Sequence, residues 1–393
     1  MNILFYSIVG ISPNKGGTER ATYRLAKFLH CRHGHNCYSI YSTTDKTINS
    51  DAFCHSLYLP MEKIASNEFR NYVINNKIDI VINQSGSFGV QKPIRNALRG
   101  LKCKYVVVHH FEPGWYKKTL EAISFQEIYR KASSLSKFMT PFLYMEKLML
   151  CRYRVFRNSR SYYNDYKESD AVVLLSTNAI QQYKKYAFIH RDEKFHVIHN
   201  MLSFNKYATD EDILRKKKNV IVVSRLEEKT KRISLALKAW QLIKRDPISD
   251  GWSLTIIGEG IDRNNYERIA EDMNLEDYSF TGHQEPISFY KEASIFLMTS
   301  RSEGWGLTIT ESQQFGVVPV CFDSFSSLND IVINGNNGFI VPDNDMKEYA
   351  NKTLKIMGDD TLRFQMAHNS VLSSRRFEEG KIGNDWNDLL NNI

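Results

Sequence analysis

The chain has 393 residues, which is long for one domain and sufficient for two. Its 42% of hydrophobic and 24% of charged residues are typical of a soluble globular protein and exclude a low-complexity chain. The net charge of +8 suggests an anionic partner without identifying one.

No run of eighteen apolar residues occurs, so we expect no transmembrane helix. The apolar residues 1–9 lack a basic leader and a cleavage site, and we interpret them as a first buried strand rather than a signal peptide. The six cysteines show no metal-ligand spacing and are interpreted as reduced thiols of a cytoplasmic protein.

The first half of the chain begins with a strand at residues 2–9 and a glycine-containing turn with Gly16 and Gly17. A helix with apolar residues at helical spacing follows and is expected to stop near Gly34, before a second strand at 36–42. This order predicts a doubly wound parallel sheet. The three-glycine spacing of a dinucleotide site is absent, and an ordinary flexible turn is the alternative for the glycine pair.

Further strands are predicted at residues 78–82 and 104–108, and the second of them ends in His109 and His110. Ligands of such sheets bind beyond the carboxyl ends of the strands, so a histidine there can reach a ligand. The spacing His-x-x-Pro-Gly-Trp favours His110, whereas strand register could favour His109. A structural role is the alternative for the pair.

Residues 115–167 contain eleven basic and four acidic residues, a net charge of +7, with interleaved apolar and aromatic side chains. This pattern predicts one or two basic amphipathic helices suited to an anionic membrane surface. A solvated helical insertion at the domain edge is nearly as good an interpretation. A nucleic-acid site is less well supported, because no binding module is recognisable.

Strands at 171–175 and 195–201 complete the first sheet, and the polar residues 203–218 are expected to form a linker. A second wound sheet begins with a strand at 219–224, followed by Arg225 and, at the start of a helix, Lys231. Two such cations can hold a diphosphate, with Lys229 and Arg232 as alternatives to Lys231. Ordinary surface basic residues are the other interpretation.

Strands at 254–257 and 278–281 precede the most informative stretch, residues 293–320. It combines a short apolar strand, a turn with Gly304 and Gly306, and a helix from residue 307 that ends at Gly316. Glycines before a helix N-terminus form an anion site suited to a phosphate. Glu303 and Glu311 would repel that phosphate on contact and are better explained as acceptors for neutral hydroxyls. A solvated turn with two surface glutamates is the alternative.

This stretch, Ser300-Arg301-Ser302-Glu303-Gly304-Trp305-Gly306 with a second glutamate at Glu311, resembles the signature of retaining glycosyltransferases of the GT-B fold, family four (bacterial group 1 glycosyltransferases). The resemblance implies that Glu311 holds the nucleotide ribose and that Glu303 lies beside the donor sugar. It also implies a phosphate-binding turn made of Gly304, Trp305, Gly306, Leu307 and Thr308.

Other positions match the same family. Arg225 and Lys231 correspond to its diphosphate-binding cations, and the histidine of the pair His109 and His110 to a group near the sugar. The family also places a glycine pair near the donor phosphates, a base-contacting strand end, and an Asn before the interdomain hinge. The glycine pair corresponds to Gly16 and Gly17, the strand end to Gly282 and His283, and the Asn to Asn200.

The resemblance implies an α/β protein of two Rossmann-like, doubly wound parallel-sheet domains that face a cleft. We expect an N-terminal acceptor-side domain at 1–203 with the basic insertion 115–167. A nucleotide-sugar domain at 204–375 and a C-terminal helix at 376–393, which crosses back to the first domain, complete the expected organisation.

The implied reaction is transfer of a sugar, with retention, from a UDP- or GDP-linked donor to a glycan or lipid-linked acceptor, in synthesis of a bacterial envelope polysaccharide or glycolipid. We expect no cofactor, no nucleic-acid partner, and no metal, because both Asp-x-Asp sequences (210–212 and 343–345) are interpreted as structural. The alternatives are a sugar-nucleotide epimerase of the same fold and a non-catalytic carbohydrate-binding protein. We expect a cytoplasmic enzyme that is peripheral at the inner membrane face if the basic insertion binds lipid.

Overall fold

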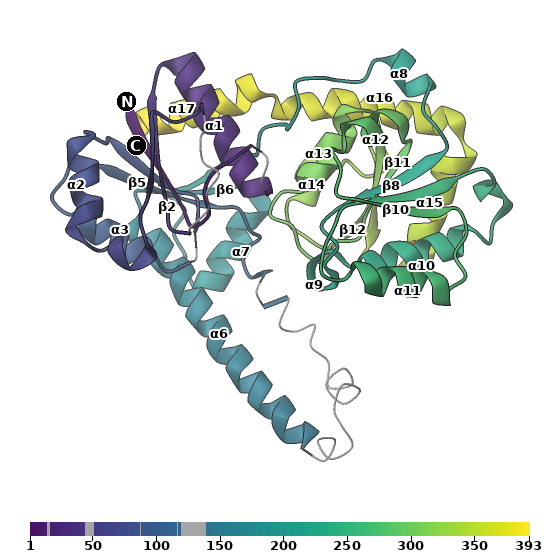
Figure 1. Ribbon diagram of the computed structural model, residues 1–393, viewed down its shortest axis with the longest axis horizontal. Coiled ribbons are helices and arrows are strands. Elements are labelled where there is room, and N and C mark those ends of the chain that lie inside the picture. The colour runs from purple at the N-terminus through teal and green to yellow at the C-terminus, as the bar shows by residue number, and fades with distance from the viewer. Residues whose placement is uncertain (14–15, 44–50, 87, 116, 119–138) are drawn as a thin grey trace. The chain divides into compact units, whose positions relative to one another are not determined.

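The computed structural model describes the chain except residues 14–15, 44–50, 87, 116 and 119–138 (Figure 1). The fold divides into two compact units. Unit 1 comprises Met1–Met201 and Glu379–Ile393, and unit 2 comprises Leu202–Glu378. Each unit is built on its own parallel sheet, which confirms the predicted fold class.

The sheet of unit 1 has seven parallel strands in the order β3-β2-β1-β4-β5-β6-β7. The chain starts in the middle, runs to one edge, and returns beside β1 at β4, so the winding reverses between these two strands. The strands are β1 (Asn2–Ser7), β2 (Asn36–Tyr41), β3 (His55–Tyr58), β4 (Ile80–Asn83), β5 (Lys104–His109), β6 (Ala171–Leu174) and β7 (Phe195–Val197).

Helices cover both faces of this sheet, because alternate strand residues are buried on either side. Ile3 and Phe5 pack in one apolar cluster, and Leu4 and Tyr6 in the other. The C-terminal α17 packs in the first cluster and contacts α1, which ends at a left-handed Gly34 as predicted. The helices are α1 (Gly17–His33), α2 (Asn67–Asn75), α3 (Gln91–Leu98), α6 (Thr140–Glu168), α7 (Thr177–Ala187) and α17 (Glu379–Asn392).

The basic insertion contains a single long helix, α6, in its described part. Residues 116 and 119–138, the rest of the predicted amphipathic segment, lie outside the described residues. Among the residues that the structure describes, no helix is both long enough and apolar enough to cross a membrane.

The sheet of unit 2 has six parallel strands in the order β10-β9-β8-β11-β12-β13, so its winding reverses between β8 and β11. Its strands are β8 (Asn219–Val223), β9 (Ser253–Ile257), β10 (Tyr278–Gly282), β11 (Ile295–Met298), β12 (Val318–Asp323) and β13 (Phe339–Pro342). Its helices are α8 (Asp210–Leu214), α9 (Glu228–Lys231), α10 (Ile233–Ile243), α11 (Arg263–Asp272), α12 (Ile287–Glu292), α13 (Leu307–Gln314), α14 (Leu328–Ile331), α15 (Met346–Gly358) and α16 (Asp360–Ser374).

The polar segment 203–218 is not the open linker that its composition indicated. The Ala208 amide donates to the Gln314 carbonyl, and the Gln314 side chain donates to the Phe204 carbonyl. Residues 210–214 form α8, whose start carries a reciprocal capping box between Thr209 and Asp212. The segment therefore packs as part of unit 2, because its backbone polar groups find partners there.

Candidate active site

The carboxyl ends of β8 and β11 carry the predicted phosphate-binding residues of unit 2. These two strands are neighbours at the point where the winding of the sheet reverses. The loops after such strands diverge to opposite faces, which leaves room for a ligand at this edge. The residues that follow β8 and β11 are therefore brought close together although they lie far apart in the sequence.

Lys231, the last residue of α9, forms an ion pair with Glu303, which follows β11. The Lys231 Nζ to Glu303 Oε1 distance is 2.5 Å, and the two side chains are 19% and 14% exposed. The pair is thus largely screened from water but still reachable from solvent. Such a cation can move to an anionic ligand while the carboxylate accepts a neutral hydroxyl.

Arg232, the alternative to Lys231 named above, is buried and bonded within unit 2. Its Nε donates to the Thr299 carbonyl at 2.8 Å, and its Nη2 donates to the Ser300 carbonyl at 3.0 Å and to Asp343 at 2.7 Å. The guanidinium therefore ties the end of α9 to the chain that leaves β11, and it holds Lys231 beside Glu303. Lys229 is exposed.

Arg225 lies just beyond the end of β8 and is exposed. Its side chain is 68% exposed and pairs with Glu227 at 3.1 Å. A long exposed side chain can change rotamer at low cost, so this position leaves Arg225 free to turn toward a bound anion.

Two glycines that the sequence interpretation did not single out hold the backbone around Arg225. A Cβ on Gly258 would lie 1.8 Å from the Ser224 carbonyl oxygen, and a Cβ on Gly260 would lie 2.2 Å from the Leu226 carbonyl oxygen. The Leu226 amide also donates to the Glu259 carbonyl at 2.9 Å. The loop after β9 therefore lies directly on the loop after β8, an approach that only glycine permits.

The turn 302–306 leads into α13 with the backbone expected of an anion site. Gly306 has a φ of 97° and precedes a helix that no side chain caps. Trp305 is buried, and its ring contacts Phe377 edge to face. This contact anchors the turn to the core of unit 2. Leu307 and Thr308 are half-buried at the start of the helix, where backbone N–H groups and the helix dipole favour a negative charge.

Glu311 lies within α13 and is 1% exposed. Its Oε1 accepts a hydrogen bond from the Ser203 hydroxyl at 2.5 Å, and its Oε2 accepts one from the Tyr290 hydroxyl at 3.1 Å. A buried carboxylate requires such partners. Each carboxylate oxygen of Glu311 thus accepts a hydrogen bond from a hydroxyl group. A ribose hydroxyl would donate the same kind of hydrogen bond.

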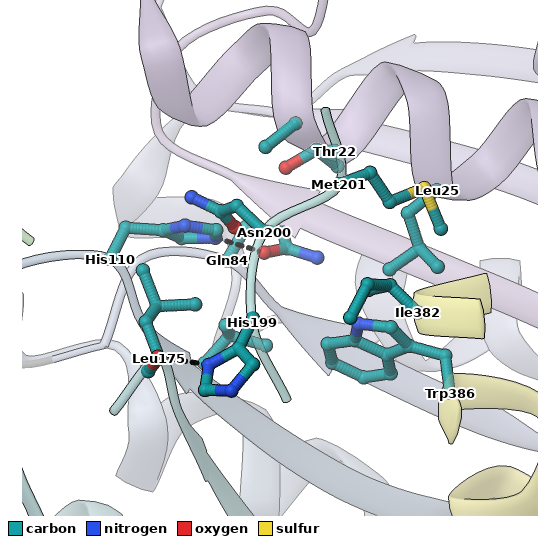
Figure 2. A pocket seen from close by; sticks show the side chains of 12 residues that line it. Thr22, Leu25, Gln84, His110, Leu175, His199, Asn200, Met201, Ile382 and Trp386 are labelled. Atoms are coloured by element: carbon teal, nitrogen blue, oxygen red, sulfur yellow. Dashed lines mark hydrogen bonds between the residues drawn. The ribbon is translucent and has the colours of Figure 1, made fainter. Parts of the chain in front are cut away.

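In unit 1 the structure separates the two candidate histidines. His109 is 3% exposed, with its ring stacked on Tyr162 and its Nε2 3.2 Å from Asp165 of α6. His110 instead lines a pocket, as Figure 2 shows. Alternation along β5 explains the difference, because neighbouring side chains point to opposite sides.

The pocket beside His110 is small, with a cavity volume of about 20 Å³, and it opens to solvent. His110 Nε2 lies 2.5 Å from the Gln84 amide oxygen, and burial together with the nearby His109 lowers the pKa of His110 to about 3. The imidazole is therefore neutral, and with Nε2 donating to Gln84 its Nδ1 is an acceptor. The other lining residues come from α1, α17 and the ends of β5–β7: Ala21, Thr22, Leu25, Val108, Leu175, His199, Asn200, Met201, Ile382 and Trp386.

The remaining predicted site residues lie at strand ends and helix starts. Gly16 caps α1, and Gly17 begins that helix. Gly282 ends β10 with a positive φ of 76°, and its carbonyl accepts from the Gly258 amide. His283 follows it and is exposed.

The two Asp-x-Asp sequences have structural partners. Asp345 caps α15 by accepting from the Glu348 amide at 3.0 Å, and Asp343 binds Arg232. Asp212 belongs to the capping box of α8, and Asp210 pairs with His368. Among the described residues, no group of three His, Cys, Asp or Glu is arranged to hold a metal ion.

Known proteins share parts of this sequence. Residues 204–371 match the family described as glycosyl transferases, group 1. An uncharacterized glycosyltransferase of Haemophilus influenzae is 30% identical over 157 residues, which cover 39% of this chain and 44% of that protein. The capsular polysaccharide biosynthesis glycosyltransferase CapM of Staphylococcus aureus is 28% identical over 207 residues, 48% of this chain and 51% of CapM. The chain spans about half the length of the curated relatives it matches.

Solved structures resemble the whole chain. The crystal structure of Anabaena HepE with UDP and glucose has a TM-score of 0.72 at 18% identity, and the alignment covers 100% of both chains. The apo form of the lipopolysaccharide outer core galactosyltransferase WaaB has a TM-score of 0.71 at 15% identity with the same coverage. Residues 204–371 thus resemble the group 1 glycosyl transferases, and the chain has the two-domain GT-B fold over its whole length.

Proposed function

We propose that the chain transfers a sugar from a nucleotide-sugar donor to an acceptor hydroxyl in the synthesis of a bacterial envelope polysaccharide or glycolipid. The observation that carries the proposal is the Lys231–Glu303 pair beside the uncapped start of α13. The similarity to CapM, a capsular polysaccharide glycosyltransferase, and to WaaB, a lipopolysaccharide galactosyltransferase, supports it. A glycan or lipid-linked acceptor follows from the same relatives.

In the proposed donor site, the diphosphate lies against the amides of residues 304–308. Lys231 exchanges its contact with Glu303 for a phosphate oxygen, and the exposed Arg225 turns to the same group. Negative charge on the diphosphate grows as the glycosidic bond breaks, so cations and dipoles fixed in advance lower the barrier. Glu303, released from Lys231, accepts hydroxyl hydrogens of the donor sugar.

Glu311 is proposed to hold the ribose. Its present partners are two hydroxyls, one of them from Ser203 in the irregular segment that enters unit 2. A ribose hydroxyl can replace the Ser203 hydroxyl without changing the chemistry at the carboxylate, and such an exchange avoids burying an unpaired charge. Gly282 and His283, at the end of β10, are proposed to contact the base.

The pocket of unit 1 is proposed to take the acceptor. His110 and Gln84 are the polar groups proposed to meet the acceptor hydroxyl there, because Trp386, Ile382 and Leu25 are buried in the core of unit 1 (Figure 2). With a pKa of about 3, His110 is too weak a base to remove a proton at neutral pH. It is proposed to orient the acceptor hydroxyl by accepting its hydrogen bond at Nδ1.

We propose retention of configuration without a covalent enzyme intermediate. Retention by double displacement needs a carboxylate nucleophile beside the sugar. Glu303, the carboxylate proposed beside the donor sugar, is proposed to accept hydrogen bonds from its hydroxyls rather than to attack it, and the lining of the unit 1 pocket contains no carboxylate among the described residues. The leaving phosphate is then the base that deprotonates the acceptor on the same face.

We also propose that no metal ion is required, since Lys231 and Arg225 supply the positive charge and the aspartates of both Asp-x-Asp sequences have other partners. Six free cysteines, of which Cys37, Cys103 and Cys321 are buried, support a cytoplasmic location.

Acceptor-dependent release of nucleoside diphosphate tests the reaction. We expect release from a UDP- or GDP-sugar only when a glycoside acceptor is present, undiminished in EDTA, because the residues named above replace a metal. Product analysis by NMR should show the donor's anomeric configuration.

Each other outcome of this assay contradicts one part of the proposal. Interconversion of the sugar nucleotide without an acceptor would identify an epimerase. Loss of release in EDTA with recovery in magnesium or manganese would contradict metal independence alone. Binding of glycans without turnover of any donor would identify a carbohydrate-binding protein.

A further inference from the structure

The hydroxyl of Tyr290 lies between two parts of the proposed donor site. It donates to Oε2 of Glu311 at 3.1 Å, and it lies 3.4 Å from the Thr308 carbonyl oxygen at the start of α13. Tyr290 is fully buried, and its ring stacks on Phe315 with the ring planes 4° apart. The direction of the Glu311 carboxylate therefore depends on where α12, the helix that carries Tyr290, is held.

Lys216, in the segment between α8 and β8, caps the C-terminal end of α12. This helix has only six residues, and the last carbonyl groups of a helix have no partner within it. The Nζ of Lys216 donates to the Tyr290 carbonyl at 2.8 Å and to the Ala293 carbonyl at 2.9 Å. It also donates to the Lys291 carbonyl at 3.3 Å. An ammonium group has three hydrogens, so these carbonyls use all of its donors.

The hydrogen bonds of Lys216 are what distinguish it from an apolar residue at the same position. Lys216 is half-buried, and burial lowers its pKa to about 7, because a charged group loses hydration there. A methionine, also unbranched, would fill much of the same space without a charge to desolvate, but it cannot donate a hydrogen bond. The contribution of the lysine is therefore the cap on α12.

The next residue, Lys217, holds the same helix end in a different way. Its amide donates to the Glu292 carbonyl at 2.8 Å, and its carbonyl accepts from the Ser294 hydroxyl at 2.7 Å. Its side chain is 66% exposed and forms a solvated ion pair with the Glu292 carboxylate. Such a pair contributes little to stability. Two neighbouring lysines thus contact α12, Lys216 through backbone carbonyls and Lys217 through an exposed carboxylate.

We propose that Lys216 is a positioning residue of the donor site, which caps α12, holds the Tyr290 hydroxyl against Glu311 and so sets the direction in which this carboxylate meets the ribose. The inference rests on the proposed function of unit 2 and extends it to a residue that acts through Tyr290. With Oε2 held by Tyr290, Oε1 faces the Ser203 hydroxyl, which a ribose hydroxyl is proposed to replace. Without the cap, nucleotide binding must also order the carboxylate, and that ordering costs affinity.

Titration calorimetry of the full chain with UDP and with GDP tests the proposal. Lys216→Met should weaken binding of the preferred nucleotide by roughly fivefold, within the range for residues that act through a neighbour. In transfer assays the KM for the donor should rise by a similar factor, while kcat stays within about twofold of the wild type. This split is expected because Glu311 is proposed to contact the ribose rather than the sugar that reacts.

A double-mutant cycle with Tyr290→Phe separates positioning from a general effect on the fold. Tyr290→Phe alone should weaken nucleotide binding, because it removes the hydroxyl that holds Oε2 of Glu311. Adding Lys216→Met to Tyr290→Phe should weaken binding by less than about twofold more, because the hydroxyl through which Lys216 acts is already absent. The loss of stability that follows removal of the cap should appear in both backgrounds, as measured by thermal unfolding.

Two other lysines provide matched controls. Lys217→Met removes the exposed neighbour of Lys216. Lys194→Met removes a lysine that caps α6 of unit 1 in the same manner, since its Nζ donates to the Ser169 carbonyl at 2.6 Å and to the Tyr166 carbonyl at 3.1 Å. Both variants should bind the nucleotide within about twofold of the wild type. Circular dichroism verifies that every variant is folded at the temperature of the calorimetry.

Three results would overturn the proposal. The first is unchanged nucleotide affinity in folded Lys216→Met protein. The second is an equal loss in Lys194→Met, which would show that lower stability rather than positioning weakens binding. The third is full multiplication of the two losses in the double variant, which would show that Lys216 does not act through Tyr290. Absence of UDP and GDP binding by the wild type would instead contradict the proposed donor site itself, and this inference with it.

Discussion

Replacing Lys231 by alanine is expected to lower kcat by about 100- to 1000-fold. The loss follows because a preorganised donor to a developing negative charge contributes roughly 3–4 kcal/mol to the transition state. The free energy of unfolding should also fall, because Glu303, which is 14% exposed, would lose its cation, so kcat is compared on protein that remains folded. Steady-state kinetics with the donor varied, together with calorimetry of the nucleoside diphosphate, measures the effect.

Lys229→Ala is the matched control for this prediction. Lys229 lies two positions earlier on the same short helix and is exposed, so its removal should leave kcat within about twofold. An equal loss in both variants would show that general positive charge, rather than the position of Lys231 beside Glu303, is what matters. Wild-type turnover in Lys231→Ala would remove Lys231 from the proposed site.

Replacing Glu311 by alanine is expected to weaken binding of the nucleoside diphosphate by about 10- to 150-fold. A hydrogen bond to a charged group contributes about 1.5–3 kcal/mol, and the proposed ribose contact would be lost. Glu303→Ala should instead lower turnover and leave nucleoside diphosphate affinity nearly unchanged, because Glu303 is proposed to contact the sugar. Titration calorimetry on both variants distinguishes the two carboxylates.

Two further substitutions separate ligand binding by Glu311 from support of the fold. Ser203→Ala and Tyr290→Phe each remove one hydroxyl partner of Glu311 and retain its carboxylate. Ser203→Ala should keep nucleoside diphosphate affinity within about threefold, because the ribose is proposed to replace this hydroxyl. Unchanged affinity in a folded Glu311→Ala protein would refute the ribose assignment.

Both sheets were predictable from the sequence because strands buried on both faces have continuous apolar runs. Ile295-Phe296-Leu297-Met298 of β11 is such a run, and it is buried throughout. β3 was missed because it lies at the edge of its sheet with half-buried and exposed residues, so His55-Ser56-Leu57-Tyr58 lacks that signal. Local pattern thus predicts central strands better than edge strands.

The candidate site was only partly predictable, because cations that are neighbours in sequence have different three-dimensional partners. Arg225, Lys229, Lys231 and Arg232 are equivalent by composition. Only the fold shows that Arg232 reaches Asp343, 111 residues further along the chain, whereas Lys231 reaches Glu303. In the same way Ser203 reaches Glu311 across 108 residues. Local motifs carry no information on such contacts.

The histidine pair and the glycines after β9 show two further limits of predicting the site from the sequence. Whether His109 or His110 meets the pocket depends on a strand register that cannot be read from one sequence. Gly258 and Gly260 did give a signal, two glycines around an acid at a strand end. Their role, to let the loop after β8 pack directly on the loop after β9, depends on a contact between distant parts of the sequence.

Binding of nucleoside diphosphates tests most directly the central claim that unit 2 holds a nucleotide-sugar donor. The wild type is screened by thermal unfolding against UDP, GDP, ADP and their sugars, with EDTA present. One of UDP or GDP is expected to raise the unfolding midpoint by several degrees, because a ligand at about 100 times its Kd stabilises by about 2.7 kcal/mol. The same nucleotide should give a weaker shift with Glu311→Ala. No shift with any nucleotide, confirmed by calorimetry, would contradict the claim.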